Sequence, residues 1–400
     1  MSRNTSTTNS APIDTVTVDR PQQFGAPQLG LALAEVDQLI RASEARNRFA
    51  VDGSAVTVAV CDTGLNTRHI DFRGKVRDQR NFTADNEGAL EDANDGHGHG
   101  SNVSGIIVAN GDHRGIAPGA GIVPLKVLSN MGRGSFAAVA EALEWVLDNA
   151  GRHNISVVCM SLGAGDNRTS DDGLVGDRIN EQIQHLRERR IAVVIAAGND
   201  YFKHGSAQGM SYPAILRHCV SVGAVYDKRA GSFSYESGAK AFSTGPDRIT
   251  PFSQRLHHSV GGSCRTDLFA PGAPVTSAGI EGPRGESVQH GTSQAAPVVA
   301  GVIALMQTLH LELCGELPEV DELVGMLQRG ATLIRDGDDE SDNVTNTGLD
   351  FERVDAVGAL DALTCRIQKR LFLGGAPLRG HARLTIPIDS GLHDQSNAAE

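Results

Sequence analysis

The stretch that decides the fold is VTVAVCDTG, residues 56–64, in which an apolar, β-branched run leads into Asp62 and a glycine. A continuous apolar run of this length, bounded by turn residues, is typical of a strand buried on both faces of a parallel sheet. Similar runs recur along the chain. The full set of expected strands is 55–61, 122–128, 155–160, 191–197 and 219–224.

Helical patterns lie between or after these runs. In residues 136–150 the apolar positions recur every three or four residues, which makes one apolar stripe. Residues 177–190 predict a more polar helix, and residues 292–310 are almost wholly apolar, which predicts a helix buried all round. Alternating strands and helices predict an α/β fold with helices on both sides of one central, mostly parallel sheet.

Composition limits the class of protein. The 400-residue chain is 40% hydrophobic and carries a net charge of −12. This charge argues against a nucleic-acid-binding surface, which needs a concentrated basic patch. No run of about 18 apolar residues predicts a membrane span, so no membrane partner is expected. The N-terminus lacks the apolar centre of a secretion signal, although a mis-assigned start codon would hide one. The expected location is therefore the cytoplasm, and six widely spaced cysteines without a CxxC pair fit reduced thiols there.

The chain divides into three parts by composition. Residues 1–30 are polar and aperiodic, which predicts a flexible N-terminal extension. A main domain follows over residues 31–363, beginning with a short helix in 31–47. Within it, residues 227–263 are rich in serine, glycine and charge, and predict a loop insertion or a small hairpin. Residues 364–400 are a C-terminal extension of unknown role.

Two segments carry candidate acid–base groups. Asp62 ends a buried strand, where open α/β sheets place their sites, although a lone aspartate there is more often a turn residue. In DGHGHGSNVSG, residues 95–105, glycines flank His99, and histidine is the usual base near neutral pH. The same segment offers Asp95, His97 and His99 as metal ligands, or it is a solvated glycine-rich loop. From this segment alone the three interpretations stay open.

Two further segments carry candidate groups for acyl transfer. In HGTSQAAPVVAG, residues 290–301, Ser293 lies at the start of the apolar helix, where unpaired N–H groups favour developing negative charge. A lone serine there is usually only a helix cap. In AAGND, residues 196–200, the Asn199 amide could donate to an oxyanion, although asparagine beside glycine is more often a turn residue.

The order of these segments is more specific than any one of them. Asp62, His99 and Ser293 follow one another at strand or helix ends, and Asn199 lies between the histidine and the serine. CDTG, HGSNVSG, SLG at 161–163, AAGN, DLFAPG at 267–272 and GTSQAAP resemble blocks of the subtilase family in the same order. The resemblance covers about residues 45–360. It implies a three-layer subtilisin-like fold and a serine endopeptidase whose catalytic domain is 31–363.

The resemblance also implies residue roles. Ser293 would attack the peptide carbonyl, His99 would act as general base and acid, and Asp62 would orient His99. The Asn199 amide and the Ser293 N–H would form the oxyanion hole. Two strands would flank an extended protein or peptide substrate. The implied substrate-binding residues are Gly132, Gly134, Phe136, Ser161, Leu162 and Gly163, with Ser211 and Asp200 around the primary pocket.

The chain departs from the family pattern at several positions. Asn102 and Ser104 stand where the family often has histidine and alanine, and Gln294 replaces the usual methionine after the nucleophile. The loop VANGDHRGIAP, residues 108–118, is shorter than the loop that houses calcium in many subtilases. Asp71 matches a calcium-binding residue of such relatives. We therefore expect no required cofactor and assign no metal ligand, with calcium optional. The oligomeric state stays open.

Overall fold

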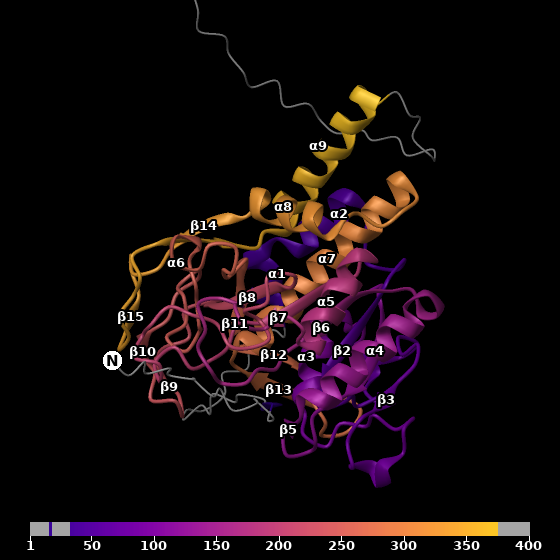
Figure 1. Ribbon diagram of the computed structural model, residues 1–400, viewed down its shortest axis with the longest axis horizontal. Coiled ribbons are helices and arrows are strands. Elements are labelled where there is room, and N and C mark those ends of the chain that lie inside the picture. Colours follow the sequence, from indigo (N-terminus) through magenta and orange to yellow (C-terminus); the bar gives the residue numbers. More distant parts are fainter. Residues whose placement is uncertain (1–15, 18–32, 375–400) are drawn as a thin grey trace, which may run out of the picture.

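The computed structural model describes residues 16–17 and 33–374, with side chains described over residues 33–370 (Figure 1). Most of the expected N-terminal extension, residues 1–15 and 18–30, therefore lies outside the described residues. The same holds for residues 375–400 of the expected C-terminal extension. The division into these extensions and a central domain stays a prediction.

A nine-stranded sheet forms the centre of the molecule. Neighbouring strands run parallel throughout, except for the antiparallel pair at one edge, β14 with β16. The five strands expected from the apolar runs are β2, β4, β6, β7 and β8, which occupy adjacent central positions. In spatial order the strands are β14 (Thr332–Arg335), β16 (Asp350–Arg353), β11 (Leu268–Ala273), β8 (Val220–Tyr226), β7 (Ala192–Ala196), β6 (Ile155–Met160), β2 (Thr57–Asp62), β4 (Gly121–Lys126) and β3 (Arg80–Asn81).

Helices cover both faces of the sheet, so the fold has three layers. Alternate side chains of β2 point to opposite faces, because successive residues of a strand do. Val58 and Val60 pack with α3 (His99–Val108) and α7 (Thr292–Cys314). Ala59 and Cys61 pack with α4 (Phe136–His153) and α5 (Arg178–Glu188) on the other face. The predicted α/β fold with a mostly parallel central sheet is confirmed.

Smaller elements surround this core (Figure 1). Two helices, α1 and α2, stand where a single helix was expected over 31–47. Arg41 separates them because its backbone adopts a left-handed conformation, φ 57°. The remaining elements are β1 (Val16–Thr17), α1 (Ala34–Ile40), α2 (Ala42–Phe49), η1 (Ile70–Phe72), η2 (Asn86–Gly88), β5 (Arg133–Gly134), β9 (Phe233–Ser234), β10 (Lys240–Ser243), α6 (His258–Gly261), β12 (Val275–Ala278), β13 (Glu286–Gln289), α8 (Val320–Gly330), β15 (Ser341–Asp342) and α9 (Ala356–Gly374).

Helix α7 is the central helix of one face. By length and composition it could cross a membrane, but 83% of its apolar window is buried inside the protein. Its surroundings are β6, β7, β8, β11 and α3, so its apolar surface is already covered. Pro297 lies in the second turn and has no N–H to donate to the Ser293 carbonyl, which instead accepts a hydrogen bond from Ser161 Oγ at 2.7 Å. The helix therefore carries Ser293 at its start on a rigid, fully packed support.

Residues 227–263 contain a small hairpin, which their composition allowed as the alternative to a loop insertion, and they also enter the core. They include β9 and β10, which pair with each other, and β10 also pairs with β15 to complete a small antiparallel sheet. Residues 249–256 then run through the interior, where Arg255 is fully buried. Its Nε lies 3.2 Å from Oδ2 of the equally buried Asp336, and its guanidinium stacks 3.7 Å from the Tyr201 ring centre. Residues 249–256 are therefore part of the core, and Arg255 is held there by Asp336, which lies far away in sequence.

Helix α9 crosses the expected domain boundary at residue 363. Leu360, Leu363 and Ile367 on this helix belong to the main hydrophobic core. The packing of the core therefore continues past the expected boundary, at least as far as residue 367. The weak pattern of the last residues hid this continuation from a sequence-based reading.

Candidate active site

Asp62 and His99 form a buried ion pair or hydrogen-bonded pair at the carboxyl edge of the sheet. His99 Nδ1 lies 2.8 Å from Asp62 Oδ1 and 3.0 Å from Oδ2, and both side chains are almost fully buried. The Thr63 N–H also donates to Asp62 Oδ1, at 2.6 Å. A buried carboxylate needs such donors, because burial without them is costly. The carboxylate fixes which imidazole nitrogen faces it and leaves Nε2 as the other reactive nitrogen.

His99 begins helix α3, and Asp95 holds that beginning in place. Asp95 Oδ1 accepts hydrogen bonds from the backbone N–H groups of His97 and Gly98, at 2.9 and 2.8 Å. Its Oδ2 accepts from the Ser101 N–H and hydroxyl, at 2.9 and 2.8 Å, and Thr63 Oγ1 donates to Oδ1 at 2.9 Å. Burial raises the pKa of Asp95, but these donors outweigh it and leave the pKa below its ordinary value.

These bonds bear on the alternative of a metal at Asp95, His97 and His99. Both Asp95 oxygens face N–H and O–H donors, and His99 Nδ1 faces Asp62. The ligand atoms of the three residues do not form one of the compact metal-ligand groups found among the described residues. The arrangement therefore favours an anchored helix start, with Asp95 as its anchor, over a metal centre.

Ser293 lies at the start of α7 and is linked to Ser161 in both directions. Ser161 Oγ donates to the Ser293 carbonyl at 2.7 Å, and Ser293 Oγ donates to the Ser161 carbonyl at 3.4 Å. The Ser293 hydroxyl thus faces Ser161, while His99 Nε2 has no hydrogen-bond partner among the described residues. Such bonds are often loose without substrate and tighten in the complex.

Polar side chains bridge the starts of α3 and α7. Gln294 Nε2 lies 3.2 Å from Gln289 Oε1 and 3.4 Å from Asn102 Oδ1. Gln289 Nε2 in turn donates to the Gly98 carbonyl at 3.2 Å. The residue after Ser293 is thereby tied to both sides of His99, since Gly98 and Asn102 flank it.

Asn199 and the Ser293 N–H face a common position beside Gly291. Asn199 Oδ1 accepts from the Thr292 N–H at 2.8 Å and from Thr292 Oγ1 at 3.0 Å, which fixes the orientation of the amide. A Cβ on Gly291 would lie 3.3 Å from Asn199 Nδ2 and 3.4 Å from the Ser293 nitrogen. Two N–H groups therefore lie close to the place where Gly291 lacks a side chain, and Gln294 Oε1 lies nearest to the same point, at 3.0 Å.

The expected substrate-binding residues fall into two places. Ser161, Leu162 and Gly163 directly follow β6, and Leu162 and Gly163 line a cavity together with Ser293 and Asn199. Gly134 lies in β5 and Gly132 in the turn before it, while Phe136 begins α4. The Phe136 ring packs edge-on against the Tyr212 ring, with centroids 4.8 Å apart.

Strand β5 already has a partner. Val16 pairs with Gly134 and Thr17 with Arg133, both antiparallel. These two residues come from the segment expected to be a flexible extension. A peptide that added a strand along β5 would have to replace β1 at this edge, because one edge accepts one strand.

Comparison with known proteins shows which family the chain belongs to. The model of the subtilase family matches residues 53–327, well over half of the chain. The chain belongs to the subtilase family. Its predicted family is thereby confirmed.

Curated relatives resemble the chain over about 64% of its length. An intracellular serine protease of Paenibacillus polymyxa is 28% identical over 261 residues, which cover 68% of that protein. An alkaline serine exoprotease A of Vibrio alginolyticus is 34% identical over 255 residues, 39% of its length. A subtilisin of Bacillus sp. strain TA39 is 30% identical over 262 residues, 56% of its length and 63% of this chain. The match thus covers only part of each relative.

The cavity beside Ser293 in this subtilase is small, about 20 Å³. Ser211 lines it, as expected, and its hydroxyl accepts hydrogen bonds from the N–H groups of Ala164 and Gly165, both at 3.0 Å. Asp200 is not among the lining residues, and its Oδ1 pairs with Lys203 Nζ at 2.6 Å. The expected position of Asp200 around the primary pocket therefore finds no support in the cavity lining.

Asp71, the expected calcium candidate, is bound by nitrogen donors in this subtilase. His113 Nδ1 lies 2.6 Å from Asp71 Oδ2, and the His113 N–H donates to Oδ1 at 3.1 Å. Burial raises the pKa of Asp71, but His113 outweighs it and keeps the pKa below its ordinary value. Calcium requires several oxygen ligands, so these residues do not fit it.

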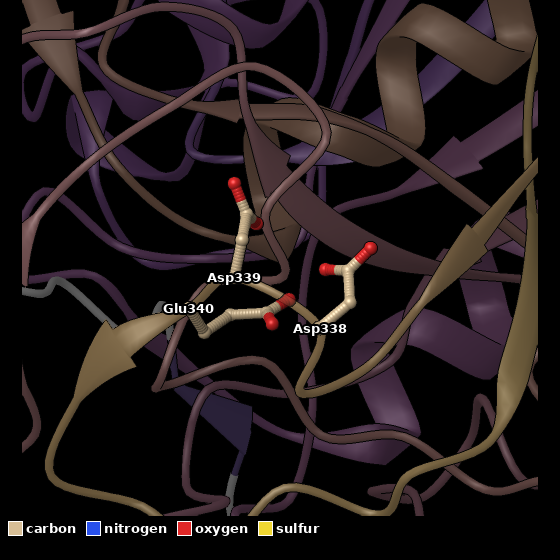
Figure 2. A group of neighbouring side chains, drawn as sticks. All are labelled: Asp338, Asp339 and Glu340. Atoms are coloured by element: carbon tan, nitrogen blue, oxygen red, sulfur yellow. The ribbon is translucent and has the colours of Figure 1, made fainter.

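One acidic group lies in the turn between β14 and β15. Among the described residues, Asp338, Asp339 and Glu340 place carboxylate oxygens within 4.8 Å of one another (Figure 2). Arg248 Nε lies 3.1 Å from Asp339 Oδ2, and Glu340 accepts from the Ile249 and Gly337 N–H groups. These partners already neutralise part of the group, so it supports no metal assignment.

Sequence reasoning missed two buried polar side chains next to the site. It considered Asp95 only in the open alternative of a metal site, and it gave Lys126 no role although this lysine is fully buried at the end of β4. A signal for Lys126 was present, since a single charge interrupts the apolar run over 122–128. Fully buried lysines are rare unless they are paired, so such an interruption is informative.

Replacing Gln294 with methionine should make the subtilase sensitive to peroxide. A thioether beside Ser293 can be oxidised to a bulky, polar sulfoxide, whereas the glutamine amide cannot. We expect mild hydrogen peroxide to abolish the reaction of Ser293 with a fluorophosphonate label in Gln294→Met. The same treatment should leave labelling of the unchanged chain intact. Rapid, site-directed loss of labelling in the unchanged chain would contradict this.

His290, three residues before Ser293, should make the fold sensitive to acid. Burial lowers its pKa to about 3, in contact with Tyr235 and Phe233. The unfolded chain binds a proton near pH 6.5, so this contribution is complete above pH 6.5 and is lost as the pH falls toward 3. At pH 5 the loss is about 2 kcal/mol.

Urea unfolding of the unchanged chain and of His290→Asn at pH 8 and pH 5 measures this contribution. The asparagine does not titrate, so the free energy of unfolding should fall by about 2 kcal/mol less in the variant. An equal fall in both proteins would show that His290 is not the group responsible.

Proposed function

We propose that this subtilase is a serine endopeptidase in which Ser293 is the nucleophile, His99 the general base and acid, and Asp62 the residue that orients His99. The observation that carries the proposal is the buried contact between His99 Nδ1 and Asp62, at 2.8 Å. This contact directs the second imidazole nitrogen away from the carboxylate, where it can exchange a proton. Membership of the subtilase family supports peptide-bond hydrolysis as the reaction.

In this mechanism the Ser293 hydroxyl turns from the Ser161 carbonyl toward His99 Nε2. Its oxygen attacks the substrate carbonyl while the proton moves to Nε2, and the developing imidazolium is stabilised by Asp62. The oxyanion is held by the Asn199 amide and the Ser293 N–H. His99 then gives the proton to the leaving amine. A water molecule, deprotonated by His99, cleaves the acyl-enzyme and restores the serine.

The substrate would be an extended protein or peptide segment. Its backbone would bind alongside Ser161–Gly163 and along β5, and its first side chain before the cleaved bond would enter the cavity beside Ser293. Backbone recognition of this kind tolerates many sequences. The reaction uses only side chains and water, so we propose that no cofactor is required.

A cytoplasmic location is also part of this proposal. The relative from Paenibacillus polymyxa bears the name of an intracellular protease, whereas the one from Vibrio alginolyticus is named an exoprotease. The name of the relative from Paenibacillus polymyxa is what supports the cytoplasmic alternative.

A fluorophosphonate probe tests the nucleophile directly. We expect the probe to label Ser293 and to stop hydrolysis of casein, while a chelator leaves the activity intact. Ser293→Ala should lose labelling and about 10⁶-fold in kcat, the size known for loss of this nucleophile in a subtilisin. Unchanged casein hydrolysis in Ser293→Ala would refute the assignment, and peptide binding without labelling would indicate an inactive binding module.

Removing residues 1–17 should lower KM for long peptides, because β1 and the substrate compete for the edge of β5. Losing about 1 kcal/mol of strand pairing corresponds to roughly a fivefold change. The rate of labelling by a small fluorophosphonate should stay the same, since the probe does not reach β5. An unchanged KM for a peptide with four residues before the cleaved bond would contradict the competition.

A further inference from the structure

Lys126 is a fully buried cation next to the proposed catalytic pair. It is the last residue of β4, where the parallel register places it opposite Asp62 on β2. Its side chain has no exposed surface. A lysine inside a protein is costly unless its ammonium is paired, so its partners indicate why it is there.

The ammonium contacts three different loops. Lys126 Nζ donates to the Thr63 carbonyl at 2.6 Å, directly after Asp62 in the chain. It donates to Asn130 Oδ1 at 2.9 Å and lies 3.4 Å from Asp85 Oδ2. One buried cation therefore joins the loop after β2, the acidic loop after β3 and the turn before β5.

Asn130 extends this connection to the segment before His99. Its Oδ1 also accepts from the Gly96 N–H at 3.0 Å, and its own N–H donates to Asp85 Oδ2 at 2.5 Å. Asn130 lies in the turn closed by the Ser129–Arg133 and Gly132–Ser129 backbone hydrogen bonds, both 2.8 Å. The same amide oxygen thus links the turn that carries β5 with the loop that precedes the base.

We propose that Lys126 is a positioning residue that couples the substrate strand at β5 to the Asp62–His99 pair. The proposal rests on the serine endopeptidase activity proposed above. Lys126 does not contact the reacting atoms. It acts through the Thr63 carbonyl on one side and through Asn130 and Gly96 on the other.

The charge of Lys126 adds an electrostatic effect to the geometric one. Burial lowers the pKa of the ammonium, and Asp85, Asp95 and Asp62, the charged groups that face it, oppose this lowering. A cation at this position opposes protonation of the nearby Asp62–His99 pair. Its removal should therefore move the acid limb of the kcat/KM profile to higher pH.

Lys75 offers a matched control within the same protein. It is also a buried lysine, 8% exposed, and burial likewise lowers the pKa of its ammonium. Its Nζ donates to the Pro118 carbonyl, and its own carbonyl accepts from the Ile122 N–H near the beginning of β4. Lys75 thus lies by the amino end of the strand whose carboxyl end carries Lys126.

The experiment compares Lys126→Met with Lys75→Met in the full chain. Each protein is titrated with fluorophosphonate to count active sites, and kcat and KM for a long peptide are then measured from pH 5 to pH 9. We expect Lys126→Met to lose about 10- to 100-fold in kcat, as for a misaligned site, and to shift its acid limb to higher pH. Lys75→Met should keep both kinetic properties, even where urea unfolding shows that it has lost stability.

Variants of Asn130 test the coupling without removing a buried charge. Asn130→Ala removes the oxygen that joins Lys126 to Gly96, and we expect kcat to fall severalfold. Asn130→Asp keeps an accepting oxygen at this position and should retain more of the activity than the alanine variant. If Lys126→Met does not fold, this pair of variants decides the proposal.

The outcomes separate this proposal from the activity on which it rests. If the wild-type protein is labelled and active, and Lys126→Met has the same kinetics as Lys75→Met, the positioning role of Lys126 is overturned. The endopeptidase assignment would then still stand. Equal losses in Asn130→Ala and Asn130→Asp would also overturn the positioning role. A wild-type chain that neither reacts with the probe nor cleaves peptides would overturn the endopeptidase assignment, and the positioning role with it.

Discussion

The carboxylate of Asp62 sits at the end of a strand that is buried on both faces, and it must be satisfied there by neighbours. Its position follows from β2 being central in a parallel sheet, with strands on either side and helices above and below. The Thr63 N–H and the His99 imidazole satisfy it directly. The need to pair one buried charge thus brings the start of α3 to the carboxyl edge of the sheet, where Ser293 and Asn199 also lie.

Further buried charges stabilise the loops that this arrangement requires. Asp95 gathers donors from the turn that leads into His99, and Lys126 gathers acceptors from the loops on the other side of Asp62. Arg255 and Asp336 pair in the interior near Tyr201, two residues after Asn199. Loss of one member of such a pair leaves an uncompensated buried charge, so these loops are held far more firmly than their glycine-rich composition suggests.

The sequence was sufficient for features that depend on short, local patterns. The five apolar runs became β2, β4, β6, β7 and β8, and the apolar stretch from Thr292 became α7, because full burial requires a continuously apolar sequence. Asp62 and Asn199 could be selected because they end or follow apolar strands, and Ser293 because it lies at the start of the apolar helix. His99 could be selected because glycines flank it and because it lies between Asp62 and Ser293 in the order typical of subtilases. Features that depend on distant partners could not be selected. Arg255 lies in a segment of polar composition, and its buried partner Asp336 comes much later in the chain, so the local sequence did not indicate that Arg255 is buried. The pairing of Val16 with Gly134 likewise leaves no mark in the sequence around either residue.

The departures from the family pattern are connected to one another in space. Gln294 and Asn102 are two of the departures expected from the sequence resemblance, and their amides contact each other across the starts of α7 and α3. A polar side chain in this buried place requires a polar partner, so the two replacements support one another.

The loop after α3 likewise provides a partner for a buried polar group. His113, carried by this loop, approaches Asp71 closely enough to pair with it, where a longer loop could hold an ion. Burial alone would lower the pKa of His113, but Asp71 outweighs it and raises the pKa, which favours the ion pair. This subtilase therefore pairs with its own histidine a buried carboxylate whose position the sequence resemblance matched to a calcium-binding residue.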